Sequence, residues 1–97
     1  MAAYIVFIRE CMLNQAEFDT YSEKVKPTLE GHPVTVHAYY GKHEVLEGPS
    51  AEGVVIVSFP TVADAKAWYD GPVYKEVREL RFKGAVYRAI LVEGVPA

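Results

Sequence analysis

The sequence predicts a single α+β domain of 97 residues, in which two helices cover one face of a four-stranded antiparallel sheet. Two observations predict this class. Candidate elements follow one another in the order strand, helix, strand, strand, helix, strand, with turn residues between them. Two of the strand candidates, residues 4–8 and 54–59, are apolar on both faces, which is typical of strands in the centre of a sheet.

The first half of the chain holds the first helix. Asn14, with Glu17 three residues later, resembles a capping box and predicts the start of that helix. Pro27 should kink or end it near Lys26, because proline lacks a backbone donor. Residues 34–40 then alternate between polar and apolar positions, which predicts a half-exposed strand.

The second half of the chain holds the second helix and the last strand. Thr61, with Asp64 three residues later, predicts a helix start, and Gly71-Pro72 predicts an interruption after which a fresh helix begins. Arg81 and Lys83 fall in the last turn, where they would complement the helix dipole. The alternating charges from 75 to 83 indicate a solvated helix face, and residues 86–93 form the last strand candidate.

This order is that of a ferredoxin-like βαββαβ domain with strand order 4-1-3-2. The first and third strands are expected to lie in the centre, parallel to each other. The second and fourth are expected at the edges, and they carry His37 and Arg88.

The two central strands are apolar on the face that the helices cannot cover. Ile5, Phe7, Val55 and Val57 point one way, and Tyr4, Val6, Val54 and Ile56 point the other. Soluble proteins rarely leave such a face in water. We therefore expect a homodimer that pairs sheet to sheet over about 1,600 Å² or more.

Composition excludes several classes of function. The net charge is −3, which disfavours nucleic acid as a partner. The one cysteine, Cys11, fits a reducing compartment. The longest apolar run, residues 2–8, is too short to span a membrane, and we expect a cytoplasmic protein. Seven tyrosines indicate a pocket or a pairing surface.

Several segments resemble a known family. Phe59-Pro60-Thr61, then Ala67-Trp68-Tyr69, Gly71-Pro72 and Tyr74, are similar to the motifs of the bacterial family called domain of unknown function 1330. The segments 44–48 and 92–94 match it too. The resemblance implies the dimeric α+β barrel superfamily, in which two ferredoxin-like sheets pack face to face. That superfamily includes cofactor-free monooxygenases, lactone isomerases and haem proteins, so function does not follow from the fold.

Two residues of the second strand are candidates for catalysis. His37 and Tyr39 lie on the same side of an alternating strand, so both side chains could project into one cleft. A histidine there could move a proton at neutral pH, and the tyrosine could orient a substrate oxygen. The alternative is an edge-strand pair that lies half in water or at the dimer contact.

Four further residues are candidates for ligand binding. Arg88 could anchor a carboxylate, or it could protect the sheet edge against aggregation. Tyr69 and Tyr74 flank the Gly71-Pro72 break, where a hydroxyl could face a cavity. His32 could cap a helix or reach a pocket. Trp68 is expected to fill the core.

No metal or cofactor is expected from the sequence. The three histidines, at positions 32, 37 and 43, have no metal-ligand spacing, and none stands out as a haem ligand. Two functions therefore remain open. The chain is either a homodimer that binds a small organic ligand between sheet and helices, or a small cofactor-independent enzyme that uses His37 and Tyr39.

Overall fold

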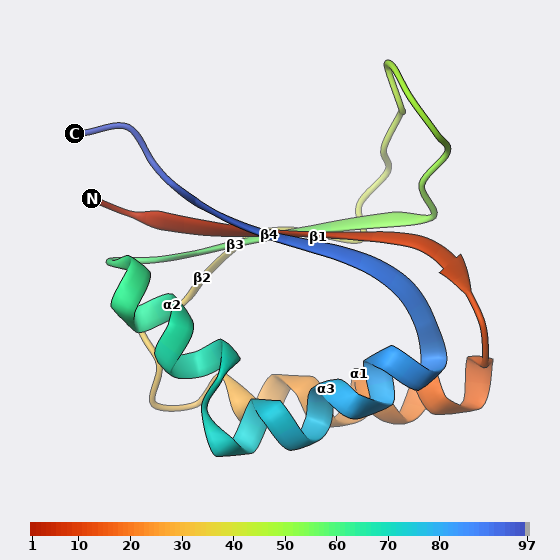
Figure 1. Ribbon diagram of the computed structural model, residues 1–97, viewed down its shortest axis with the longest axis horizontal. Helices are drawn as coiled ribbons and strands as arrows, with labels where there is room; N and C mark the ends of the chain where they lie inside the picture. Colours follow the sequence, from red (N-terminus) through yellow and green to blue (C-terminus); the bar gives the residue numbers. More distant parts are fainter. Residues whose placement is uncertain (97) are drawn as a thin grey trace.

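The chain folds into two layers, one of sheet and one of helices. The computed structural model describes residues 1–96. The elements are β1 (Ala3–Met12), α1 (Gln15–Thr28), β2 (Thr35–Tyr39), β3 (Gly53–Phe59), α2 (Val62–Tyr69), α3 (Pro72–Gly84) and β4 (Ala85–Glu93). All helices lie on one face of the sheet, and the two chain ends leave the same end of it (Figure 1). The predicted ferredoxin-like fold is confirmed.

The sheet has the order β2-β3-β1-β4, which is the predicted order 4-1-3-2. The prediction that the two central strands run parallel is wrong, because β1 and β3 are antiparallel from Ala3 opposite Phe59 to Arg9 opposite Gly53. The physical reason is the crossover through α1. It returns the chain so that β2 runs parallel to β1, and β3 then comes back antiparallel between the two.

The predicted helix starts are present. The Asn14 side chain accepts a hydrogen bond from the Glu17 backbone N–H at 3.1 Å, and the Thr61 hydroxyl accepts one from Asp64 at 3.0 Å. Pro27 does not end α1 at Lys26, since the helix continues to Thr28. A proline this close to a helix end costs only one hydrogen bond of the final turn.

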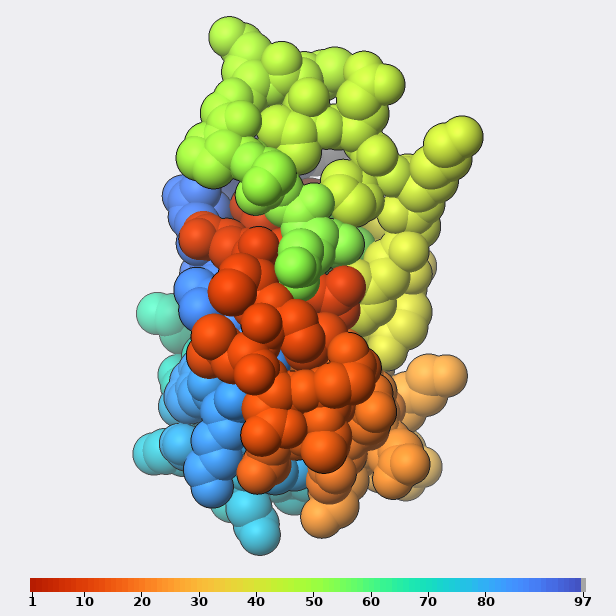
Figure 2. All heavy atoms as spheres, turned by 90° about the vertical axis from the view of Figure 1, so that its right-hand side faces the viewer, coloured from red at the N-terminus to blue at the C-terminus, as the bar shows by residue number. Residues whose placement is uncertain are grey.

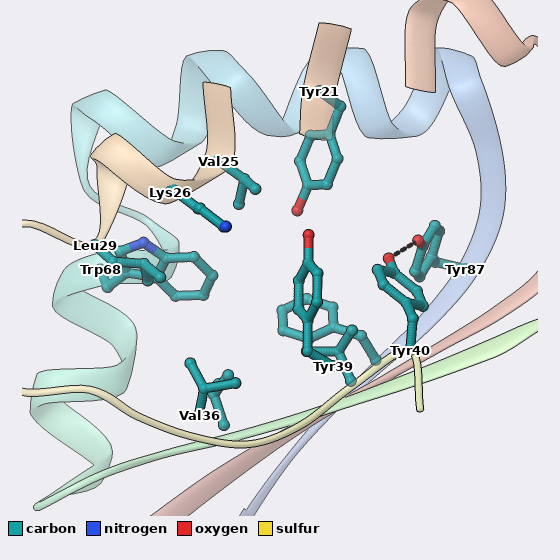
Figure 3. A pocket seen from close by; sticks show the side chains of 12 residues that line it. Tyr21, Val25, Lys26, Leu29, Val36, Tyr39, Tyr40, Trp68 and Tyr87 are labelled. Carbon is teal, nitrogen blue, oxygen red and sulfur yellow. Dashed lines mark hydrogen bonds between the residues drawn. The ribbon is translucent and has the colours of Figure 1, made fainter. Parts of the chain in front are cut away.

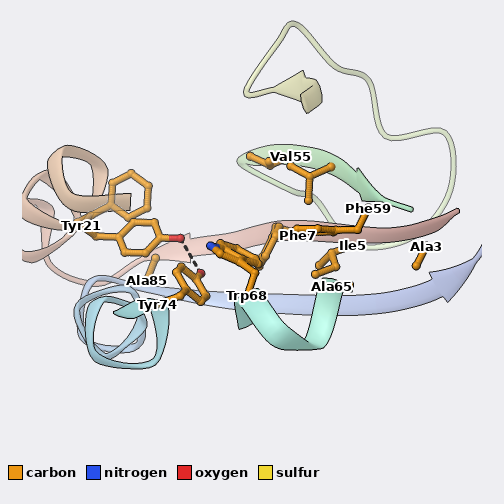
Figure 4. Packing of buried hydrophobic residues seen from close by; sticks show 12 residues of the cluster. Ala3, Ile5, Phe7, Tyr21, Val55, Phe59, Ala65, Trp68, Tyr74 and Ala85 are labelled. Atoms are coloured by element: carbon orange, nitrogen blue, oxygen red, sulfur yellow. Dashed lines mark hydrogen bonds between the residues drawn. The ribbon is translucent and has the colours of Figure 1, made fainter. Parts of the chain in front are cut away.

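The core lies between the helices and the sheet (Figure 4). Phe59 and Tyr74 are fully buried, and the Trp68 ring stacks on both, with centroids 5.8 and 4.0 Å apart respectively. The indole Nε1 of Trp68 donates to the Thr28 hydroxyl at 3.1 Å. Trp68 therefore belongs to the helix–sheet core, as its spacing predicts.

The other face of the sheet carries no helix (Figure 1). The predicted division of side chains holds, since Ile5, Phe7, Val55 and Val57 are buried under the helices, and Tyr4, Val6, Val54 and Ile56 are half-buried on the other face. Ile90 and Val92 of β4 pair with Val6 and Tyr4 and extend this apolar surface. We call these last six residues the open face.

Most of the long connection between β2 and β3, residues 40–52, stands away from the body of the molecule (Figure 2). It leaves the sheet on the side opposite the helices (Figure 1). Leu46 within it is 84% exposed. None of the helices in residues 1–96 is long and apolar enough to cross a membrane.

Candidate functional site

A cavity of about 260 Å³ lies between α1 and the sheet (Figure 3). Its walls come from α1, β2, β3, the central strand β1, the start of β4 and the core tryptophan. The lining residues are Phe7, Tyr21, Val25, Lys26, Leu29, Val36, Tyr39, Tyr40, Val55, Val57, Trp68 and Tyr87. Val36 and Tyr39 are half exposed, so the cavity opens to solvent beside the edge strand β2.

Tyrosine hydroxyls supply most of the polar groups of this cavity. The hydroxyls of Tyr21 and Tyr74 lie 2.8 Å apart, and those of Tyr40 and Tyr87 also form a hydrogen bond. The Tyr39 hydroxyl points across the cavity toward that of Tyr21 (Figure 3). An aromatic wall with a few convergent hydroxyls is typical of a site for a small organic molecule.

These buried phenols stay neutral over the physiological range. Burial is the main cause that raises the pKa of Tyr21, Tyr40, Tyr74 and Tyr87 above the usual value of 10.0. A neutral phenol both donates and accepts a hydrogen bond. The cavity therefore offers hydroxyl groups and no phenolate at neutral pH.

Lys26 is the only lining residue that carries a full charge. It lies in the last turn of α1, and its ammonium group points into the cavity in Figure 3. The side chain is solvent-exposed, which places its charge at the mouth.

A second cation, Arg81, lies buried behind the cavity wall. It is 2% exposed, and its guanidinium carbon sits 5.2 Å from the Phe7 ring centroid and 5.1 Å from that of Tyr87, two lining residues. Its Nη2 donates to the Tyr69 hydroxyl at 3.2 Å. Its Nε and Nη1 have no hydrogen-bond partner among the described residues.

The prediction of a solvated helix face over 75–83 is wrong at Arg81. Arg81 shares a stripe of α3 with Tyr74, Val77 and Gly84, which are spaced by three or four residues and face the core. That spacing was the signal available in the sequence, and the regular alternation of charge concealed it.

The structure separates the two catalytic candidates. A bulge in β2 shifts the register between Val36 and Ala38, so Tyr39 pairs with Val55 and lines the cavity. His37 falls on the opposite face, where its ring hydrogen-bonds the Ser58 hydroxyl at 2.6 Å and lies 5.7 Å from the Tyr4 ring. The expectation that His37 and Tyr39 share one cleft is therefore wrong, because simple alternation ignores the extra residue.

The ligand-binding candidates also lie in different places. Arg88 is exposed on the helix-free face, opposite Ile8, and His32 is half-buried after α1 without lining the cavity. Tyr74 is fully buried and does not line the cavity, but it contacts two lining residues, Tyr21 by a hydrogen bond and Trp68 by stacking. Tyr69 lines a separate, smaller hollow of about 190 Å³ beside α2 and β4.

Three lining tyrosines escaped sequence reasoning. Tyr21 reads as one of the apolar positions of α1, and Tyr87 as part of a strand. Tyr40 should face away from Tyr39, yet both line the cavity because Tyr40 has a positive φ of 53° that turns its side chain inward. Only the surplus of tyrosines in the composition pointed to such a site.

Among residues 1–96, no group of three or more His, Cys, Asp or Glu side chains could hold a metal ion. The cavity wall itself carries aromatic, aliphatic, phenolic and ammonium groups. These groups can enclose a planar molecule, exchange hydrogen bonds with its polar atoms and attract a negative charge.

Comparison with known proteins identifies a family but no activity. The model of the family "Domain of unknown function (DUF1330)" matches residues 2–95. No curated protein matches the chain.

Solved structures share the fold at low sequence identity. A protein of unknown function from Rhodopseudomonas palustris is similar with a TM-score of 0.72 and 19% identity, covering 99% of this chain and 84% of that one. SnoaB, a cofactor-independent oxygenase from Streptomyces nogalater, is similar with a TM-score of 0.63 and 9% identity, and the match covers 99% of this chain and 95% of SnoaB. A dimeric protein of unknown function and ferredoxin-like fold from Bacteroides fragilis is similar with a TM-score of 0.61 and 10% identity, and the match covers 96% of each chain.

Proposed function

The chain belongs to the DUF1330 family, and from that premise we propose that it binds a small aromatic molecule in the cavity between α1 and the sheet. The observation that carries this proposal is the cavity wall itself. Aromatic and aliphatic side chains form nearly all of it, and the hydroxyls of Tyr21 and Tyr39 point into it (Figure 3). Such a wall favours a flat apolar ligand with few polar atoms.

The size of the cavity limits the ligand. At about 260 Å³ it lies just below the usual range for ligand sites, roughly 300–1,000 Å³. One or two fused rings fit this space, and a nucleotide or a haem does not. The core residues Phe7 and Trp68 form part of the wall, so the site is largely formed before a ligand arrives.

Binding is better supported than turnover. SnoaB is a cofactor-independent oxygenase, but at 9% identity its likeness to this chain is a likeness of fold alone and carries no reaction with it. An enzyme that uses His37 as a base would need that ring in the cavity, whereas it lies on the other face of the sheet. The lining residues offer phenols with raised pKa values, and these are poor bases at neutral pH.

Pairing through the open face belongs to the same proposal. Seven half-exposed or exposed apolar side chains meet there, the six of the open face and Ile8 beside them. The Bacteroides fragilis protein with this fold is dimeric. A second copy packed sheet to sheet would remove this surface from water and leave the cavity, on the helix side, accessible.

Titration calorimetry with two naphthalene compounds, neutral 2-naphthol and charged 2-naphthoate, tests the ligand site. At least one should bind saturably, and the indole N–H resonance of Trp68 should shift, because Trp68 is the only tryptophan and lines the cavity. Val36→Phe, which fills the mouth, should weaken binding at least tenfold. Val73→Phe, at an exposed position of α3, is the matched control. Failure of both compounds to bind would refute the proposal.

A further inference from the structure

We infer that the cavity selects a ligand with a negative charge, namely a small aromatic carboxylate whose acid group lies near Lys26 and within the field of Arg81. This inference rests on the proposed function and adds the chemical class of the ligand. Three features carry it: the sign of the charges around the cavity, the missing partner of Arg81 and the position of the hydroxyls.

Three positive charges lie on the cavity wall or against its rings, and one of them, Arg9, 5.1 Å from the Tyr40 ring centroid, is already paired with Glu52. Lys26 lines the mouth, and Arg81 lies against the rings of Phe7 and Tyr87 on the inner side. No aspartate or glutamate is among the lining residues. This contrasts with the net charge of the whole chain, which is −3. The cavity is thus a positive site on an acidic protein, and it should repel amines and attract anions.

Arg81 lacks the counter-charge that a buried arginine normally has. The two salt bridges in residues 1–96 join Arg9 to Glu52 and Arg78 to Asp70, and neither involves Arg81. Aromatic faces and the Tyr69 hydroxyl solvate part of the guanidinium, while its Nε and Nη1 stay unpartnered. A buried charge is costly unless it is paired. A carboxylate in the adjoining cavity would supply a counter-charge in a region of low dielectric constant, where attraction is strong.

Hydroxyl donors lie where such an acid group would rest. The Tyr39 and Tyr21 hydroxyls face each other across the cavity, and the Lys26 ammonium points toward the same space (Figure 3). A neutral phenol can donate to a carboxylate oxygen. The ring of the ligand would then lie against Trp68 and Phe7. A carboxylate is ionised at neutral pH, whereas a simple phenol is not.

The test compares 2-naphthoate with 2-naphthamide, a neutral compound of nearly the same shape, by calorimetry on the full chain. We expect the carboxylate to bind roughly tenfold more tightly or better, since hydrogen bonds to charged groups are worth about that much. Lys26→Met and Arg81→Met should each reduce this preference severalfold. The matched controls are Lys24→Met, at an exposed position two residues before Lys26, and Lys83→Met, near the end of α3. Both should leave the preference unchanged.

The possible outcomes separate the two proposals. Equal affinity for the two compounds would overturn the charge inference and leave the aromatic site intact. A preference that survives both Lys26→Met and Arg81→Met would overturn it as well, because the anion would then be held elsewhere. Binding of neither compound would refute the ligand site itself. If Arg81→Met does not fold, the Lys26→Met variant tests the inference, since its preference for the carboxylate should fall while that of the Lys24→Met control should not.

Discussion

At the scale of single residues, the pair formed by Tyr21 and Tyr74 joins the core to the cavity. Tyr74 is fully buried against Trp68, and Tyr21 extends from α1 to meet it at 2.8 Å. Each hydroxyl satisfies the other in a place with little access to water. The pair should therefore behave as a unit, in which removing both hydroxyls costs less than the sum of removing each one alone.

A double-mutant cycle checks this. Tyr74→Phe alone should lower the free energy of unfolding by about 1–3 kcal/mol, because the Tyr21 hydroxyl is left unsatisfied. The Tyr21→Phe and Tyr74→Phe double variant should be less destabilised than the sum of the two single variants. Urea denaturation gives all four values. Strict additivity would mean that the hydroxyls are solvated separately.

Stability should also depend on alkaline pH. Burial raises the pKa of Tyr21 and Tyr74 in the folded protein, while in the unfolded chain a tyrosine titrates near its usual value of about 10. Above that pH the unfolded chain releases protons that the folded protein retains. The contribution of these two residues to the free energy of unfolding should therefore be constant below pH about 9 and fall above about 10, by up to about 1.4 kcal/mol per pH unit for each residue. The double phenylalanine variant should show a shallower decline, and an equal slope would contradict the assignment.

At the scale of elements, the backbones of α1 and α3 come into close contact at Gly84. A Cβ atom at that position would lie 2.8 Å from the Phe18 backbone nitrogen and 2.9 Å from its Cα. The Gly84 carbonyl also accepts hydrogen bonds from the backbone N–H groups of Leu13 and Asn14. The end of α3 thus fixes the start of α1, the helix that forms one wall of the cavity.

Gly84→Ala should destabilise the fold by about 1–3 kcal/mol, because backbone atoms cannot yield as a flexible side chain can. Chemical denaturation measures this loss. Gly41→Ala is the matched control, since a Cβ there meets nothing within 4 Å and the backbone is not in the left-handed region. Equal stability of the two variants would show that α1 and α3 can separate without cost.

At the scale of the whole molecule, we propose that one side of the sheet binds a ligand and that the other side pairs with a second copy. The helices lie on one face of the sheet (Figure 1), and the cavity lies on that same side. The open face carries half-buried and exposed apolar side chains. Val6 lies at the centre of the open face, between Ile56 and Ile90 on the neighbouring strands. A charge at Val6 should therefore weaken pairing far more than a charge at the edge of the open face would.

Light scattering after gel filtration checks the pairing. The parent chain should have about twice the monomer mass of 10.8 kDa, and Val6→Lys should shift it toward the monomer. Val73→Lys, at an exposed apolar position of α3 on the other side, should leave the mass unchanged. A parent chain that runs as a monomer at micromolar concentration would refute pairing through this face.

The sequence predicted the fold well and the site poorly, for physical reasons. Apolar runs, helix caps and the break at Gly71-Pro72 are local signals, so strand order and core followed from them. The cavity depends on a bulge before Ala38 and a positive φ at Tyr40, which have no local signature, and on a buried Arg81, whose helical spacing the alternating charges concealed. Each of them breaks an alternation that sequence reasoning takes as regular.

The bulge at His37 affects how relatives of this chain should be compared. One extra residue in an edge strand exchanges which side chains face the cavity and which face the helix-free side of the sheet. Evolution could therefore convert a contact residue into a pocket residue by a single insertion or deletion, without changing any amino acid on either side. When relatives are aligned, the position of the bulge has to be fixed before this strand is compared, because otherwise one alignment column mixes two environments. The variability of positions 37 to 40 would then reflect shifts in register as much as changes in chemistry.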